Sequence, residues 1–414
     1  MDITPEDSVV LAGFAARKGL SNSVHRPLKT HCLVIRNNTD TICIITNDMM
    51  ELSPDFSDKL HKAISEQSGL TSDRIFIHCT HTHSAPRVGG SSADPGGSNY
   101  RTAQMIFDNI VANAVQTIKA QKFTPFTIEI GKGSCAMNCN RREENGPIDH
   151  DVYIARFLDG KGKIIVSLVN YACHPVSLNH KSLAVSTDFP GITTEELSKQ
   201  WGGEVFYFSG ASGNVDPCGE LKADTAYTWE KGMMLAEDCM KVKFNKLKKN
   251  STLRISNKEV QLPFRIETVT ADAINAHVDE ILKWKVSQTW ENDVKGWQKE
   301  ILDRISTGEV KNYLPFRIAG VNVGSLVLLF SQGEPFNEYQ SDLRKNLLSH
   351  PVLFIAYTNG QNSYLPSRHA YETDEYVYEK EQMHIYIKAP YPVSDRMPTV
   401  YEAAIKEVIE NIVN

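Results

Sequence analysis

The stretch that decides the fold runs from Val323 to Tyr357 and reads VGSLVLLFSQGEPFNEYQSDLRKNLLSHPVLFIAY. Its two apolar runs, Val323–Phe330 and Val352–Tyr357, have the length and composition of buried strands. The segment between them, Pro335–His350, reads as a helix. This strand–helix–strand order is typical of proteins in which helices pack on a sheet.

The same alternation continues outward along the chain. Leu33–Thr46 reads as a hairpin that turns at Asn37–Asp40, and Ser53–Leu70 as a helix capped by Ser53 with Pro54 in its first turn. Further strands are expected at 74–78, 126–130, 164–170 and 205–208, and further helices at 102–121, 193–200, 225–241 and 399–413. We therefore predict an α/β fold with a mixed central sheet flanked by helices.

The chain shows no internal repeat and no linker long enough to separate two domains, so one domain over residues 1–414 is the simplest expectation. The charged stretch Ala271–Thr307 has a helical pattern and carries Trp284, Trp290 and Trp297. We expect it to be an insertion or a lid.

Composition excludes several classes of protein. The 414 residues are 41% hydrophobic and 23% charged, with a net charge of -6, which gives no reason to expect a nucleic-acid partner. No apolar run approaches the roughly 20 residues of a transmembrane helix. The N-terminus lacks a signal sequence, so the protein is either cytoplasmic or, if a signal peptide has been removed, secreted or periplasmic. The oligomeric state stays open.

The eight cysteines are spread thinly, several of them inside apolar runs. That pattern favours buried free thiols over a disulfide framework. Cys135 and Cys139 are close enough in sequence to pair, but their spacing does not establish a bond.

Histidines and a carboxylate follow three of the expected strands. His81 and His83 follow the strand at 74–78, His174 follows the strand at 164–170, and Glu334 follows Val323–Phe330. In an α/β sheet such strand ends are where ligands bind. Each residue taken alone is more often structural, but two histidines and a carboxylate together match what a catalytic zinc ion requires. Zinc lowers the pKa of its water to about 7, and a neighbouring histidine can transfer the proton.

With these residues in place, the chain resembles the neutral/alkaline (non-lysosomal) ceramidase family in its catalytic domain. The likeness begins at Thr80-His81-Thr82-His83-Ser84-Ala85-Pro86 and includes His174-Pro175 and Gly333-Glu334. It implies a zinc ion held by His81, His174 and Glu334, with His83 as the acid/base.

Tyrosines and an arginine extend the resemblance. Tyr364, Tyr371 and Tyr376 stand at the family's spacing of seven and twelve residues, behind Asn359-Gly360. By that likeness Tyr364 is a fourth zinc ligand and Tyr376 is catalytic. Asn140-Arg141 matches the family's Asn-Arg pair, whose arginine holds the substrate or the developing oxyanion.

Two features depart from the family. In Gly213-Asn214-Val215-Asp216-Pro217, Asp216 stands where the family has an active-site serine, and a carboxylate cannot donate the same hydrogen bond at neutral pH. We expect Asp216 to orient a water, bind a cationic group or touch the metal, unless it caps a turn. Only 38 residues (414 minus 376) follow Tyr376, too few for the family's C-terminal immunoglobulin-like domain.

The sequence therefore predicts a zinc-dependent hydrolase of an amide (N-acyl) bond, acting on a small or lipid-like substrate. The first alternative is a zinc hydrolase of a non-ceramide polar amide, ester or glycan-derived substrate, which Asp216 favours. The second is a non-catalytic binding protein on the same fold.

Overall fold

The three-stranded sheet β2-β3-β4 shows why this chain forms layers in the computed structural model. Since alternate side chains of a strand point to opposite faces, Cys43 and Ile45 of β3 pack with the outer helices, whereas Ile42 and Ile44 pack against the other sheets. The sheet is therefore covered on both sides. Its strands and helices are β2 (Thr30–Arg36), β3 (Thr41–Asn47), β4 (Ile75–Cys79), α1 (Pro54–Ser68) and α2 (Tyr100–Ile118).

A mixed five-stranded sheet has the order β10-β8-β7-β5-β12, in which only β10 and β8 are parallel neighbours. Leu168 and Phe208 point into the core shared by the sheets, whereas Val169 and Tyr207 pack with helices α3 and α4. The elements are β5 (Thr127–Ser134), β7 (Asp151–Leu158), β8 (Ile164–Tyr171), β10 (Glu204–Ser209), β12 (Phe244–Lys246), α3 (Asp188–Trp201) and α4 (Thr225–Met240).

The third large sheet has the order β13-β14-β15-β17 and contains the stretch with which the sequence analysis began. Leu326 and Leu328 of β15 face the shared core, whereas Val327 and Leu329 face the C-terminal helix α10. The elements are β13 (Leu253–Pro263), β14 (Tyr313–Val323), β15 (Leu326–Ser331), β17 (Val352–Ile355), α7 (Asn337–Asn346) and α10 (Met397–Val413).

Short strand pairs hold the loops at one end of these sheets. They are β1 (Ser23–Val24) with β9 (Ala184–Val185), β6 (Asn138–Asn140) with β11 (Val215–Pro217), and β16 (Glu334–Pro335) with β18 (Tyr364–Leu365). After β18 come α8 (Arg368–Glu372), a π-helical turn (Tyr378–Gln382) and α9 (Met383–Tyr386).

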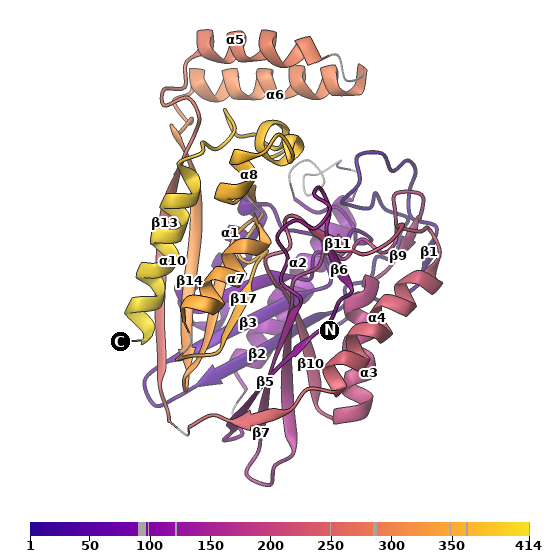
Figure 1. Cartoon of the computed structure of the whole chain (residues 1–414), viewed down its shortest axis with the longest axis vertical. Coiled ribbons are helices and arrows are strands. Elements are labelled where there is room, and N and C mark those ends of the chain that lie inside the picture. Colours follow the sequence, from indigo (N-terminus) through magenta and orange to yellow (C-terminus); the bar gives the residue numbers. More distant parts are fainter. Residues whose placement is uncertain are drawn as a thin grey trace.

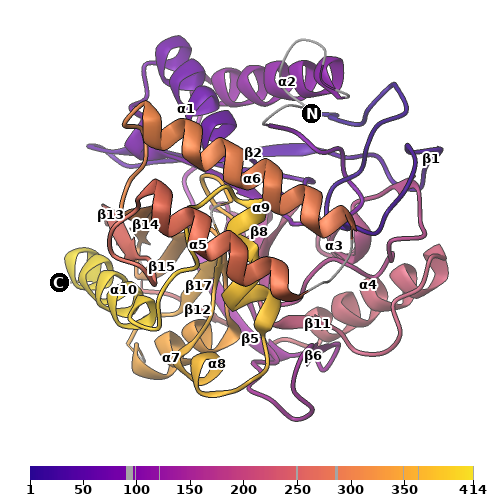
Figure 2. The same cartoon turned by 90° about the horizontal axis from the view of Figure 1, so that it is seen from above.

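The tryptophan-bearing stretch forms the expected helices, α5 (Ala271–Ile281), η3 (Leu282–Trp284) and α6 (Gln288–Ser306). These helices lie side by side at one end of the molecule, beyond β13 and β14 (Figures 1 and 2). Trp297 is fully buried, and its Nε1 donates to the Ala389 carbonyl at 2.7 Å. That contact ties α6 to the segment after α9.

The expected α/β class and the mixed, helix-flanked sheet arrangement are confirmed, although the strands divide among three large sheets. Within the described part of the chain, no helix is long and apolar enough to cross a bilayer. The structure describes residues 1–89, 97, 99–120, 122–248, 250–284, 288–347, 349–361 and 363–413.

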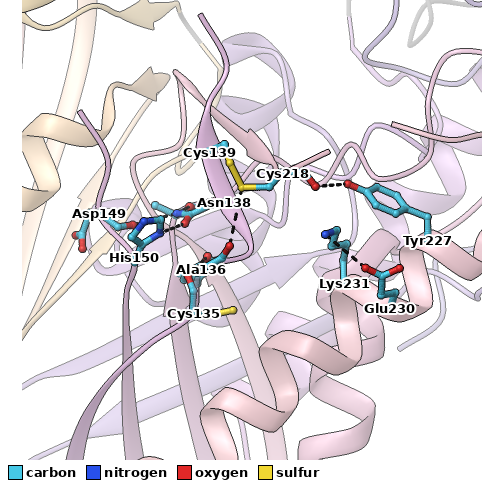
Figure 3. Close-up of a disulfide and its surroundings, with 12 residues drawn as sticks. Cys135, Ala136, Asn138, Cys139, Asp149, His150, Cys218, Tyr227, Glu230 and Lys231 are labelled. Atoms are coloured by element: carbon cyan, nitrogen blue, oxygen red, sulfur yellow. Dashed lines mark hydrogen bonds and ion pairs between the residues drawn. A yellow bond between two sulfur atoms is a disulfide. The ribbon is translucent and has the colours of Figure 1, made fainter. Parts of the chain in front are cut away.

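Six of the eight cysteines are free thiols as expected, five of them buried and Cys32 partly buried, and the expectation is wrong for the other two. Cys139 and Cys218 form a disulfide, whereas Cys135 is a buried free thiol and does not pair with Cys139 (Figure 3). The bond forms because β6 and β11 run antiparallel with Cys139 opposite Asp216, which brings Cys218 alongside. A pairing across 79 residues depends on that register, which spacing in the sequence does not reveal.

Candidate metal centre

Three histidines converge from two loops that follow parallel-paired strands. His81 comes two residues after β4, has a backbone φ of 69°, and its N–H donates to the Met49 carbonyl. His83 donates its backbone N–H to Pro175, and His174 donates its own to Val215. The ligand atoms of His81, His83 and His174 lie within 4.8 Å of one another, which is a spacing that can hold a metal ion.

The hydrogen bonds at the Nδ1 atoms fix how two of these rings present their Nε2 atoms. His81 Nδ1 lies 2.8 Å from the Met50 carbonyl, and His174 Nδ1 lies 2.6 Å from the Ser212 carbonyl. Because a carbonyl only accepts, the Nδ1 of each ring carries a proton, and Nε2 is the nitrogen that faces the centre of the group. Backbone carbonyls commonly orient metal-binding histidines in this way.

The Nε2 atoms of both rings face Glu334. Its Oε2 lies 2.9 Å from His174 Nε2 and 3.4 Å from His81 Nε2. Burial by itself raises the pKa of Glu334, but His81 and His174 outweigh that effect and hold the pKa well below its ordinary value. The carboxylate is therefore ionised and buried, and three atoms that can bind a metal meet at one point.

Tyr364 is brought beside Glu334 by the parallel pairing of β16 and β18, in which Glu334 and Tyr364 are register partners. Tyr364 is buried, and burial raises its phenol pKa well above the ordinary value, opposed by Arg141. Next to this pair, Gln361 Nε2 donates to Glu334 Oε1 at 2.6 Å and so fixes the second carboxylate oxygen.

His83 lies at the edge of the group, with its Nε2 3.3 Å from His81 Nε2 and its Nδ1 buried without a partner among the described residues. Burial, then His81 and His174, lower its pKa well below the ordinary value, so the ring is neutral. The N-terminal loop holds it. Arg17 Nη1 donates to the His83 carbonyl, the Phe14 ring lies edge-on at 5.0 Å, and a Cβ at Gly13 would come within 2.4 Å of the imidazole.

Arg141 and Asp216 approach from the β6–β11 pair, which the Cys139–Cys218 disulfide cross-links. The Arg141 guanidinium lies over the Tyr364 ring at 5.0 Å. Asp216 Oδ1 lies 3.9 Å from Arg141 Nη1 and 3.8 Å from His174 Nδ1, and it is buried without a hydrogen-bond partner among the described residues. Asp216 therefore lies at the site, beside both a histidine and the arginine.

Tyr376 reaches this group indirectly. Its hydroxyl is 2.9–3.1 Å from the Asn140 side-chain amide, its ring packs on Phe336, and its backbone φ is 60°. Tyr376 is therefore connected to Arg141 through Asn140, the residue that precedes Arg141 in the chain.

Several residues of the site were not identified from the sequence. Tyr357 stacks on His81 with ring centroids 3.9 Å apart and shares a hydrogen bond with Ser212. Burial, together with Glu334, raises the pKa of Glu51 to about 7. Tyr357 and Gln361 flank the Asn359-Gly360 turn, and that nearness to a family motif is the one clue the sequence offers for them.

Comparison with known proteins gives structural neighbours and no matching family model. A crystal structure of neutral ceramidase from Pseudomonas aeruginosa superposes with a TM-score of 0.72 at 16% identity, covering 99% of this chain and 73% of that one. A ceramidase complexed with C2 superposes with a TM-score of 0.73 at 15% identity, covering 99% and 74%.

The fold is that of neutral ceramidase. At this identity the likeness establishes the fold, and it confirms the structural side of the resemblance seen in the sequence. The ceramidase fold accounts for the way the histidine loops meet Glu334 across three sheets. The residues gathered there, two oriented imidazoles and an ionised carboxylate, fit a divalent cation such as zinc.

Proposed function

We propose that this chain is a zinc-dependent hydrolase of an amide (N-acyl) bond, with His81, His174, Glu334 and Tyr364 as the metal ligands. The observation that carries the proposal is that the Nε2 atoms of His81 and His174 both lie within 3.4 Å of the Glu334 carboxylate. A buried carboxylate held this close to two histidine nitrogens requires positive charge beside it, and a divalent cation bound to all three atoms would supply that charge.

A bound zinc ion supplies a Lewis acid that polarises an acyl oxygen and lowers the pKa of water to about 7. The residues of the chain do the rest. His83, held neutral beside His81, accepts a proton and returns it to the leaving group. Arg141 lies over the Tyr364 ring and offers fixed donors to the charge that develops on the acyl oxygen. Tyr376 holds Asn140, and through it the backbone next to Arg141.

Asp216 favours a substrate other than ceramide. A carboxylate there cannot make the hydrogen bond of the serine that it replaces, and its unpaired Oδ1 lies between His174 and Arg141. We therefore expect a polar N-acyl compound to be the better substrate. Fluorescent ceramide, N-acyl amino acids and acyl esters assayed side by side will measure the preference, and ceramide turnover as fast as the best of the others contradicts it.

The zinc proposal is tested by metal analysis and chelation. We expect about one zinc ion per chain, loss of hydrolysis after chelation, and recovery when zinc is restored. His174→Ala and Glu334→Ala should each lower zinc content, whereas Glu381→Ala, on an exposed ion pair, should leave it unchanged. A chelated protein as active as the untreated one removes the zinc mechanism.

A further inference from the structure

The segment after Tyr376 adopts a backbone that is uncommon in proteins. Tyr376 has a positive φ of 60°, and Tyr378–Gln382 form a π-helical turn. Both conformations cost energy and are found most often where a side chain has to be aimed at a functional site. Here the turn delivers two side chains. The Tyr378 ring packs on the Tyr364 ring at 6.1 Å, and Glu379 points at Arg141.

Glu379 is a fully buried carboxylate whose Oε1 accepts from two arginines. Arg141 Nη2 lies 2.6 Å away, and Arg142 Nε and Nη2 lie at 3.1 and 2.8 Å. Its other oxygen, Oε2, is buried without a partner among the described residues. Burial raises the pKa of Glu379, but Arg141 and Arg142 together outweigh it and keep the pKa below the ordinary value. Glu379 is therefore charged, and it neutralises two guanidinium groups that would otherwise repel each other.

Glu379 also sets the direction in which Arg141 points. With Nη2 anchored on Glu379, the face of the guanidinium rests against Tyr364 and Nη1 is turned toward Asp216. Arg141 Nε is buried without a partner, so within the described residues Glu379 provides the one short charged contact of this group. Since the contacts of Arg141 with Tyr364 and Asp216 are longer, loss of the Glu379 carboxylate removes the contact that fixes the guanidinium most closely.

We propose that Glu379 is a positioning residue that holds Arg141 in the orientation needed at the metal centre. The inference rests on the proposed hydrolase function, and no sequence motif pointed to it. Glu379 need not touch the substrate. Glu379 acts on the site by holding Arg141, and this distinguishes it from a carboxylate that only stabilises the fold.

The test uses Glu379→Gln, which keeps the shape and one acceptor oxygen but removes the charge. We expect kcat on the best substrate to fall on the order of 10²-fold, because displacing a catalytic group by about 1 Å has that effect, while KM changes little. Glu379→Asp, which restores the charge on a shorter side chain, should recover part of kcat. In an Arg141→Ala background, Glu379→Gln should cause no further loss of kcat.

The matched control lies two residues along the same turn. Glu381 forms a two-point ion pair with Arg265, at 2.5 and 2.6 Å, on the exposed side of the turn. Glu381→Gln removes an equal charge from the same element, so we expect kcat to stay within about twofold of the parent, in keeping with the small contribution of exposed ion pairs. Equal losses of kcat in both variants would overturn the proposal, because the effect would then belong to the turn as a whole.

Crystal structures of the parent and of Glu379→Gln separate this inference from the proposed function. We expect Arg141 against the Tyr364 ring in the parent and displaced from it in the variant. If the parent hydrolyses no substrate, the proposed function fails, yet the position of Arg141 still decides the inference. An undisplaced Arg141 in the variant, or a loss of kcat that persists in the Arg141→Ala background, overturns it.

Discussion

His83 is the residue whose role separates two versions of the site. Its Nε2 is 3.3 Å from His81 Nε2, a separation that suits either a further metal ligand or a base standing beside one. We predict that His83→Asn keeps its zinc and loses about 10²- to 10⁴-fold in kcat, the usual contribution of general acid–base catalysis. Metal content and initial rates measured on the same sample check this.

A zinc content that falls together with the rate would instead make His83 a ligand. His350 offers a control, because its Nδ1 bonds to Ser349 beside the start of β17 rather than to the histidine group. His350→Asn should change neither zinc content nor kcat.

Residue by residue, the sequence predicted the centre of the site better than its surroundings. His81, His174 and Glu334 could be found because each follows an apolar strand, and the ends of these strands, which belong to three sheets, lie close together. Tyr357 and Glu379 could not, because Tyr357 has a φ of 52° and Glu379 lies in a π-helical turn. Composition and periodicity carry no trace of such backbone, and the pairing of Glu334 with Tyr364 likewise appears only with the register.

At the scale of elements, the β6–β11 pair is held by both its ladder and the Cys139–Cys218 disulfide, and it carries Arg141 and Asp216 into the site. We predict that Cys139→Ser with Cys218→Ser lowers the free energy of unfolding by about 4.5 kcal/mol, the loop-closure value for a separation of 79 residues. Activity should fall as well, because the pair can then move. Urea unfolding and kcat measured on the double variant check both effects.

Cys135→Ser is the matched control, since Cys135 lies four residues away, is buried and is unpaired. Its loss should leave kcat unchanged under oxidising and reducing conditions alike. A reductant that leaves the stability of the parent unchanged would contradict the expectation for the disulfide.

For the whole molecule, the alternation of strands and helices was enough to predict an α/β fold but not three large sheets. The alternating pattern indicates which segments are strands. Which strands pair with each other depends on long-range contacts, such as those of β10 with β8 and of β15 with β17. The core shared by the sheets explains why these strands look uniformly apolar. Both faces are covered, by helices on one side and by other sheets on the other.

Buried histidines in this shared architecture make stability depend on pH. His78 is fully buried, its Nε2 accepts from the Ser209 N–H at 3.2 Å, and burial, with His81, lowers its pKa to about 3. Burial, the N-terminus and Lys29 likewise lower the pKa of His31 to about 4. At these two rings the unfolded chain binds more protons below about pH 6.5, so the stability that the histidines contribute is full above that pH and is lost on acidification, whereas the buried carboxyls of Asp48 and Glu51, whose pKa burial raises to about 7, act in the opposite direction. We predict that each histidine lowers the free energy of unfolding by roughly 1 kcal/mol at about pH 5.5. Urea unfolding of the metal-free parent and of His78→Gln at about pH 7.5 and 5.5 isolates the contribution of His78, because the carboxyls titrate equally in both proteins. Relative to the parent, His78→Gln should gain about 1 kcal/mol at the lower pH, whereas exposed His180→Gln should not. The same change in stability for the parent and His78→Gln would contradict the prediction.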